Sequence, residues 1–358
     1  MIVKVTLKSG KTRYRVRYRT PDYRMRSRTF DRKRDAEEFE AEMRREVRQG
    51  TFIDPQKGRM TLEALWREYY RAGTTHLRAT TQQNYRAASK HFLAQFGRWP
   101  IGKIEHADVA DWVADLSGTK GPATVRYAHR VLCLVLDYAM RTRRLAVNVA
   151  RGVRLPRQAP ARDRILTMAQ VEALADRMGS EGDLVLTMAL LGLRWSELAG
   201  LRVADVDLVR GRVRVVERAT EVGGHMDVSA PKSRASARAV AVPASLRPVL
   251  AARVADKAGT DLVFTAPDGG YLRNGNWRNR SGWTTAILEL GLTGVTPHDL
   301  RRTFGSLARS AGADLRWIQK AMGHESITTT ARIYAHLYDD ELDQIAAALD
   351  GLRKRNGA

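Results

Sequence analysis

A tyrosine near the end of the chain, Tyr334, stands ten residues after His324 in the stretch GHESITTTARIYAH. A tyrosine hydroxyl can act as a nucleophile where neighbouring groups take its proton and stabilise the charge that develops. The same stretch could equally place a packed aromatic side chain, and Tyr338 would share a helical face with Tyr334. The stretch alone therefore leaves both interpretations open.

Two distant segments carry further groups suited to phosphate chemistry. His298 and Arg301 stand three apart in TPHDLRRTFGS, where Pro297 suits the first turn of a helix, so both would lie on one helical face. Arg194 follows a glycine break in the helical pattern LLGLRWSELAGL. A guanidinium is permanently charged and matches phosphate oxygens. Taken singly, these residues could also be a surface arginine, a helix-capping histidine (His298) or a core histidine (His324).

Lys232 lies in SAPKSRASARAV, in a turn between two expected strands. A lysine on such a turn could give a proton to a leaving oxygen. The dipeptides His324–Glu325 and Ala335–His336 do not form the H-E-x-x-H pattern of a zinc-binding helix. Cys133, the single cysteine, falls in an apolar run. We therefore expect no metal site and no cofactor.

Charge is the most informative bulk property. The 358 residues include 61 Lys and Arg against 39 Asp and Glu, a net charge of +22. Such an excess favours a polyanionic partner, above all nucleic acid. The charge runs along the whole chain, whereas a membrane-surface protein would concentrate it on one amphipathic helix or tail. The sequence begins without a signal-peptide pattern and has no long apolar run, so we expect a cytoplasmic protein with no membrane partner.

Residues 3–30 alternate between apolar and basic side chains, which predicts two or three antiparallel strands with one apolar face and one arginine face. The arginines concerned are Arg13, Arg15, Arg17 and Arg19. A helix should follow from about Asp31 to Gly50. Strands can enter a DNA groove, so this sheet and helix are a candidate DNA-binding module; a solvated edge sheet is the alternative.

The rest of the chain predicts a helical domain and then a mixed, mainly helical one. Four amphipathic patterns, at 61–70, 80–97, 105–116 and 124–145, indicate a compact all-α domain. The proline- and arginine-rich segment after it, with Arg154 and Arg157, reads as an extended linker that could lie against phosphates. Strands are expected at 212–220 and 233–243, and Trp66 and Trp317 fall at core positions. The expected boundaries are 1–55, 60–153, 154–164 (linker), 165–340 and 341–358 (an amphipathic tail helix).

Taken together, these motifs resemble the tyrosine recombinase (phage integrase) family. Its signature is an Arg in a GLRxxEL context, a hairpin Lys, HxLRRTF, and GHxxxxTT followed by Tyr. The chain has each of them in the same order: Arg194, Lys232, His298, Arg301, His324 and Tyr334. The match is close over residues 160–340, departing only in details such as MGH where LGH is commoner. The helical segment resembles the core-binding domain of the family, and the N-terminal module resembles the arm-binding domain of larger integrases.

The resemblance implies a reaction and a set of roles. Tyr334 would attack a DNA phosphodiester, giving a 3′-phosphotyrosine and a free 5′-hydroxyl. Arg194 and Arg301 would stabilise the charged phosphate, and Lys232 would protonate the leaving oxygen. His298 and His324 would orient the phosphate and handle the tyrosine proton, with the division between them left open.

The implied partners are double-stranded DNA at core and arm attachment sites, a homotetramer assembled on DNA, and an accessory DNA-bending protein or excisionase. The leading interpretation is a phage or mobile-element integrase. The alternatives are a chromosome-resolving recombinase, which typically lacks an arginine-rich N-terminal module, and a DNA-binding protein without catalysis. A type IB topoisomerase fits the three-part layout less well, and the sequence has no RNA-binding signature.

Overall fold

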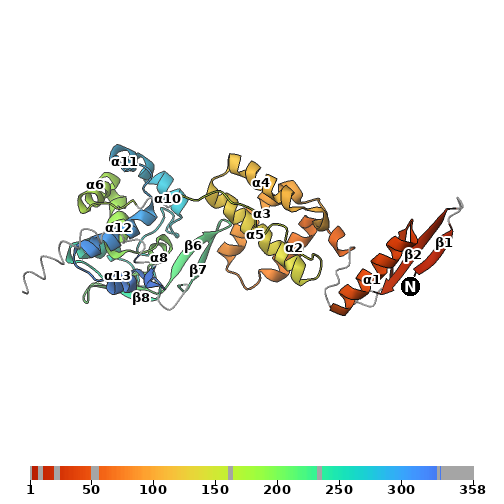
Figure 1. Ribbon diagram of the computed structural model, residues 1–358. Coiled ribbons are helices and arrows are strands. Elements are labelled where there is room, and N and C mark those ends of the chain that lie inside the picture. The colour runs from red at the N-terminus through yellow and green to blue at the C-terminus, as the bar shows by residue number, and fades with distance from the viewer. Residues whose placement is uncertain are drawn as a thin grey trace, which may run out of the picture. The chain divides into compact units, whose positions relative to one another are not determined.

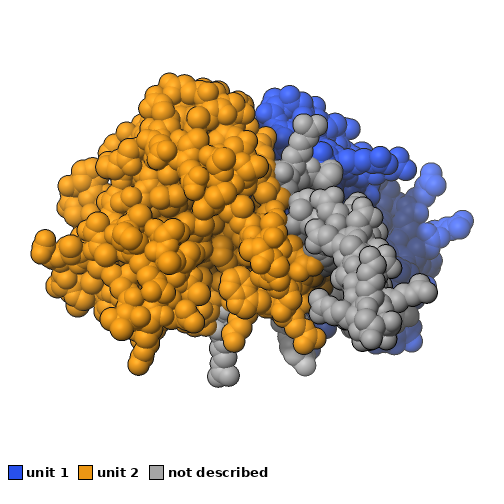
Figure 2. Space-filling model, turned by 90° about the vertical axis from the view of Figure 1, so that its left-hand side faces the viewer, with its two compact units in different colours: residues 1–159 blue, residues 160–358 orange. Residues whose placement is uncertain are grey.

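The computed structural model describes residues 2–6, 11–19, 25–49, 56–159, 164–231, 236–328 and 331. The chain divides into two compact units, residues 1–159 and 160–358, which Figure 2 shows in different colours. Within the described residues, no helix is long and apolar enough to cross a membrane. The expected fold class is confirmed: a small sheet with a helix, an all-α segment, and a mainly helical segment with small sheets.

The chain opens with three antiparallel strands on which one helix packs (Figure 1). The strands are β1 (Ile2–Thr6), β2 (Thr12–Arg19) and β3 (Met25–Phe30), and the helix is α1 (Lys33–Gln49). Val16, on the central strand, is fully buried. Phe39 of α1 contacts Tyr18 and Phe30, with ring centroids 5.6 and 5.2 Å apart. These apolar contacts hold the helix against one face of the sheet.

The register between β1 and β2 decides which side chains share a face of this sheet, and the result differs from the prediction. Four arginines of β2 alternate with Val16 and therefore share the opposite face: Arg13, Arg15, Arg17 and Arg19. However, β1 pairs Val3 with Arg15 and Val5 with Arg13, and directly paired residues lie on the same side of a sheet. The expectation of one apolar and one arginine face was wrong in this respect, because two valines of β1 lie among the arginines.

The four helices expected in the next segment are all present. They are α2 (Leu62–Gly73), α3 (Ala79–Phe96), α4 (His106–Thr119) and α5 (Pro122–Arg141), with short 3-10 turns η1 (Lys57–Arg59) and η2 (Ile101–Lys103). Thr61 caps α2 by accepting a hydrogen bond from the Ala64 amide at 3.2 Å. Apolar faces of all four helices meet in one core, to which Trp66, Phe92 and Leu132 contribute. Burial of these faces stabilises the helices more than propensity does.

The segment that follows α5 is extended and lies partly against this helical core. Arg126 of α5 donates a hydrogen bond to the carbonyl of Pro156 at 3.3 Å, and Leu155 packs on the core. Arg154 and Arg157 lie in chain without helix or strand and are exposed. Both arginines are therefore open to solvent.

The second unit is mainly helical, and its described residues form two small antiparallel sheets, ordered β4-β5-β8 and β6-β7. Figure 1 labels the two strands of the β6-β7 hairpin. The strands of this unit are β4 (Val206–Asp207), β5 (Arg212–Val215), β6 (Arg218–Val222), β7 (His225–Ser229) and β8 (Arg238–Ala241). Its α-helices are α6 (Met168–Met178), α7 (Gly182–Leu191), α8 (Trp195–Ala199), α9 (Arg247–Val254), α10 (Asn274–Arg280), α11 (Trp283–Glu289), α12 (Pro297–Ser310) and α13 (Leu315–Met322). Short 3-10 turns lie at η3 (Gly179–Glu181), η4 (Val203–Asp205) and η6 (Ala244–Leu246).

The strand predictions need one correction. The single strand expected at 212–220 is two strands, β5 and β6, which belong to different sheets. The chain changes sheet at Val216 and Glu217, which belong to neither strand. The hairpin β6-β7 turns at Gly223 and Gly224, whose φ angles of 58° and 83° suit a tight two-residue turn. The alternation of the sequence is interrupted at the same place, where apolar Val216 follows Val215 and charged Glu217 follows in turn, and the prediction of one strand overlooked this interruption.

The two tryptophans expected in cores differ. Trp66 is 7% exposed, as predicted, but Trp317 on α13 is 44% exposed. Trp317 contacts Phe304 with ring centroids 6.2 Å apart and leaves much of its surface open. The helical spacing gave the correct face of α13, but helix α12 covers that face only in part.

Candidate active site

Arg194 lies at the junction of α7 and α8, where the chain breaks as predicted. Gly192 ends α7 in the left-handed conformation, with φ 62°, and Arg194 is the N-cap residue of α8. The Arg194 amide donates to the Glu197 carboxylate at 2.9 Å and its guanidinium donates to the same carboxylate at 2.6 Å. Glu197 thus fixes both the main chain and the side chain of Arg194.

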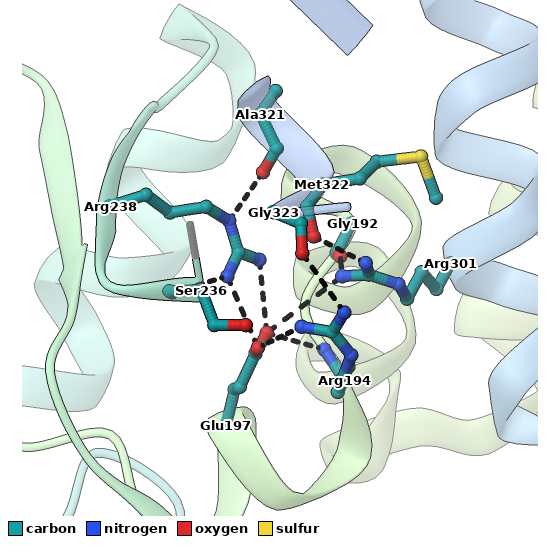
Figure 3. A network of polar contacts seen from close by, with 9 residues as sticks. All are labelled: Gly192, Arg194, Glu197, Ser236, Arg238, Arg301, Ala321, Met322 and Gly323. Carbon is teal, nitrogen blue, oxygen red and sulfur yellow. Dashed lines mark hydrogen bonds and ion pairs between the residues drawn. The ribbon is translucent and has the colours of Figure 1, made fainter. Parts of the chain in front are cut away.

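Glu197 is the centre of a buried cluster of arginines (Figure 3). The residue is only 4% exposed, and its carboxylate lies 2.6 Å from Arg194, 3.0 Å from Arg238 and 3.8 Å from Arg301. Burial alone would raise the pKa of Glu197. The hydrogen bond and charge of Arg238, with the charges of Arg301 and Arg194, outweigh burial and hold that pKa below its usual value. The carboxylate is therefore ionised and binds the cluster together.

Arg301, on α12, is 1% exposed, and its guanidinium lies beside that of Arg194 (Figure 3). Its guanidinium donates to the main-chain carbonyls of Gly192 and Met322. These bonds connect α12 to the end of α7 and to the end of α13. Arg301 and Arg194 stand far apart in the sequence, and the fold brings both to the Glu197 carboxylate.

An open cavity of about 410 Å³ lies over this cluster. Its lining includes Arg194, Glu197, Arg218, Pro231, Ser236 and His324. Two cationic side chains and one imidazole therefore face a space that can accept an anionic group. Arg218, on β6, also lies 3.7 Å from Asp227 of β7, so the hairpin holds it beside the cavity.

His324 follows α13 after its C-cap residue, Gly323, which has a φ of 64°. The His324 amide donates to the carbonyl of Gln319 at 3.1 Å, and the Gln319 side chain donates back to the His324 carbonyl at 3.1 Å. Burial, then the charges of Arg301 and Arg194, lower the pKa of His324 to about 4. At neutral pH the imidazole is therefore uncharged and can accept a proton.

His298 lies in the first turn of α12, three residues before Arg301. The residue remains exposed to solvent. Partial desolvation of its ring, then the charges of Arg302 and Arg301, lower its pKa. The charge of Arg194 acts in the same direction, which places His298 within electrostatic range of the cluster. It is not part of the cavity lining.

Two predicted site residues, Lys232 and Tyr334, lie outside the described residues, as does the tail at 341–358. Pro231 and Ser236, the described residues on either side of the Lys232 segment, both line the cavity. Ser326, eight residues before Tyr334, lines it as well. Pro231, Ser236 and Ser326 therefore all border the same cavity.

Three residues of this site were not predicted from the sequence. Glu197 stands in the GLRxxEL context and at the i+3 position from Arg194, a spacing that could have indicated an ion pair. Arg238 and Arg218 lie in arginine-rich strands, where nothing distinguishes them from their neighbours. Only the folded arrangement shows that Arg238 is buried and that Arg218 faces the cavity.

Comparison with known proteins gives the family. Residues 164–341 match the Phage integrase family, and residues 61–117 match the family described as Phage integrase, N-terminal SAM-like domain. Tyrosine recombinase XerD of Mycobacterium leprae is 31% identical over 280 residues, which span 70% of this chain and 85% of that protein. The chain belongs to the tyrosine recombinase family. It is accordingly an enzyme of DNA strand breakage and rejoining, and it acts in site-specific recombination.

Other tyrosine recombinases show the same relationship. Tyrosine recombinase XerC of Roseiflexus castenholzii is 32% identical over 270 residues, covering 70% of this chain and 82% of that protein. Among solved structures, the integrase of the Tn1549 transposon in complex with a circular intermediate DNA has a TM-score of 0.68 at 20% identity, covering 80% and 99% of the two chains. A lambda integrase dimer bound to a core site has a TM-score of 0.61 at 16% identity, covering 92% and 93%. The structural matches establish the shared fold.

Proposed function

We propose that this tyrosine recombinase is the integrase of a phage or another mobile element, and that it acts through a 3′-phosphotyrosine at Tyr334. The observation that carries the proposal is the cavity where Arg194 and His324 meet above the Glu197 cluster. The cavity is bordered by Pro231 and Ser236, between which Lys232 stands in the sequence. A phosphodiester entering it would meet cations on one side and a neutral imidazole on another.

The proposed reaction is a transesterification. The Tyr334 oxygen bonds to phosphorus, the bond to the 5′-oxygen breaks, and the DNA keeps a 3′-phosphotyrosine, so no external energy source is needed. Arg194 contacts the phosphate oxygens, and Arg301 adds the positive charge of its buried guanidinium. Lys232 gives a proton to the leaving oxygen. A neutral histidine, His324 or His298, takes the proton of the tyrosine.

The reaction requires DNA to be held by several parts of the chain. In this proposal the helical domain and the catalytic domain bind the core site, and Arg154 and Arg157 lie along the phosphates between them. The four arginines on one face of β2 bind separate arm sites. Four such chains act as a tetramer, because exchange between two duplexes needs four cleavages. An accessory bending protein or excisionase completes the assembly, in the cytoplasm of a bacterial host.

A chromosome-resolving role is the second candidate, because the similarity to XerD and XerC supports it. The N-terminal module favours the integrase. The lambda integrase structure covers 92% of this chain. The unmatched part is therefore shorter than residues 1–55, so at least some of the N-terminal module is matched. The XerD similarity covers 70% of this chain.

An integration assay separates the two roles. A plasmid that cannot replicate in the host, carrying the DNA that flanks the gene, is introduced with the full chain or with Tyr334→Phe. We expect insertion at a recurrent chromosomal position with the wild type and none with the variant. Resolution of chromosome dimers without plasmid insertion would instead support the second candidate.

A further inference from the structure

Arg238 lies at the start of β8, and its side chain is only 4% exposed. It donates to both oxygens of Glu197 at 3.1 and 3.0 Å. It also donates to the carbonyl of Ala321 at 2.5 Å and to that of Ser236 at 3.0 Å. One planar guanidinium therefore joins α8, α13 and the start of β8 (Figure 3).

The end of α13 is held by three arginines in succession. The carbonyls of Ala321, Met322 and Gly323 accept hydrogen bonds from Arg238, Arg301 and Arg194 respectively. The last carbonyls of a helix have no partner within it and carry its negative end, so cations there are favourable. The three cations that bind these carbonyls are the same three that surround Glu197.

We propose that Arg238 is a positioning residue for recombination: it fixes the end of α13, and with it His324, relative to Arg194 through Glu197 and the Ala321 carbonyl. The inference rests on the proposed function for its effect on catalysis, but the positional effect stands on the structure alone.

Arg238 differs from Arg194 in its position relative to the cavity. Arg194 lines the cavity, so a bound phosphate competes for its hydrogen bonds. Arg238 does not line the cavity, and its contacts can therefore persist when DNA is bound. Glu197 and the start of the His324 segment stay in place while Arg194 turns to the substrate.

The energetics also favour a positional role. Burying an ion pair costs desolvation that the attraction between the charges often only offsets, so apolar residues could stabilise the fold as well. What an apolar residue could not do is set the direction of Glu197 and the Ala321 carbonyl together. A lysine could neutralise Glu197, but its single ammonium lacks the fork that reaches both carboxylate oxygens and the carbonyl.

The test compares Arg238→Met and Arg238→Lys with a control, Arg212→Met. Arg212 lies on the neighbouring strand β5 and is exposed, and its side chain donates a hydrogen bond to the carbonyl of Gly211. The control therefore removes the same charge from the same sheet without touching Glu197. Folding of each full-length variant is checked by circular dichroism and thermal melting.

The first readout is hydrogen exchange at the end of α13, which requires no activity. The amides of Gly323 and His324 bond to carbonyls of Gln319 and Lys320. We expect a peptide covering residues 318–326 to exchange faster in Arg238→Met, and to a smaller extent in Arg238→Lys, than in Arg212→Met. Equal exchange in folded Arg238→Lys and the control would overturn the inference. If Arg238→Met does not fold, Arg238→Lys decides, because it retains the charge.

The second readout is the single-turnover rate of covalent adduct formation on a nicked duplex selected for binding to the full chain. Misplacement of a catalytic group by about 1 Å can cost about 10²-fold in rate. At saturating DNA, we expect a loss of rate of that order in Arg238→Met and an intermediate loss in Arg238→Lys. The DNA affinity of both variants should be unchanged. A rate equal to that of Arg212→Met would contradict the inference. Absence of adduct in the wild type would instead contradict the proposed function, and hydrogen exchange would still decide on Arg238.

Discussion

Arg301 donates a hydrogen bond to the carbonyl of Gly192, a residue 109 positions earlier in the chain. The bond sets α12 against the end of α7, so the break before Arg194 and the helix that carries Arg301 form one unit. Gly192 is suited to this place for two reasons. Its φ is 62°, and a Cβ there would lie 2.4 Å from the ring of Phe304, which is also on α12.

Gly192→Ala should therefore lower stability and move α12. A non-glycine residue in the left-handed conformation costs about 1–2 kcal/mol before any clash is counted. Gly223→Ala is the matched control, because its φ is 58° but no atom lies within 4 Å of the added Cβ. Thermal melting should show a larger loss for Gly192→Ala than for Gly223→Ala. Similar losses would mean that the contact with Phe304 is of no consequence.

Glu197→Gln should strongly destabilise the second unit. The substitution leaves three arginines near a buried site without their common anion, and breaking a buried pair from one side costs about 3–5 kcal/mol. Glu289→Gln provides the comparison, because Glu289 pairs with Arg177 at the surface, where both side chains are about half exposed. Chemical unfolding should show a large loss for Glu197→Gln and little change for Glu289→Gln. Equal losses of stability in the two variants would contradict the role of Glu197 as the shared anion of Arg194, Arg238 and Arg301.

Stability should also depend on the protonation of His324. Its pKa is about 4 in the folded chain and near the ordinary value of 6.5 when unfolded. The unfolded chain therefore binds the extra proton first, and stability falls as the pH drops from about 6.5 to about 4. His324→Gln cannot bind this proton, so its melting temperature should fall less than that of the wild type over this range. Parallel curves for the two proteins would show that His324 is not held neutral.

The N-terminal module should be separable from core-site chemistry. Removal of residues 1–55 takes away the arginine face of β2 and should abolish binding to arm DNA, while cleavage of a nicked core site persists. Binding of the full chain should weaken steeply with salt, with a log–log slope near −0.9 for each phosphate neutralised. Filter binding and cleavage assays would measure both. Equal loss of arm binding and core cleavage would argue against a modular arrangement.

The sequence predicted the elements of this fold better than it predicted their contacts. Strong helical periodicity located α2 to α5, and a glycine located the end of α7, because these signals are local. The pairing of Val3 with Arg15 and the split of β5 from β6 depend on register and sheet membership, which alternation does not specify.

The site was predictable to a similar extent. Ordered motifs singled out Arg194, Arg301 and His324. The fold brings Arg194 and Arg301 to the Glu197 carboxylate, and it brings Arg194 and His324 to one cavity. Arg238 could not be identified in this way, since burial in an arginine-rich chain is a property of the folded state. Its importance depends on Glu197 and Ala321, which lie in distant elements.

The nucleophile is tested most directly by trapping the covalent intermediate. A nicked duplex, selected for binding to the full chain, is incubated with the wild type, Tyr334→Phe or Tyr338→Phe without added metal and resolved on a denaturing gel. A protein–DNA adduct should form with the wild type and with Tyr338→Phe and should be absent with Tyr334→Phe. An adduct that survives Tyr334→Phe but is lost in Tyr338→Phe would contradict the assignment of the nucleophile, and no adduct on DNA that the protein binds would contradict catalysis itself.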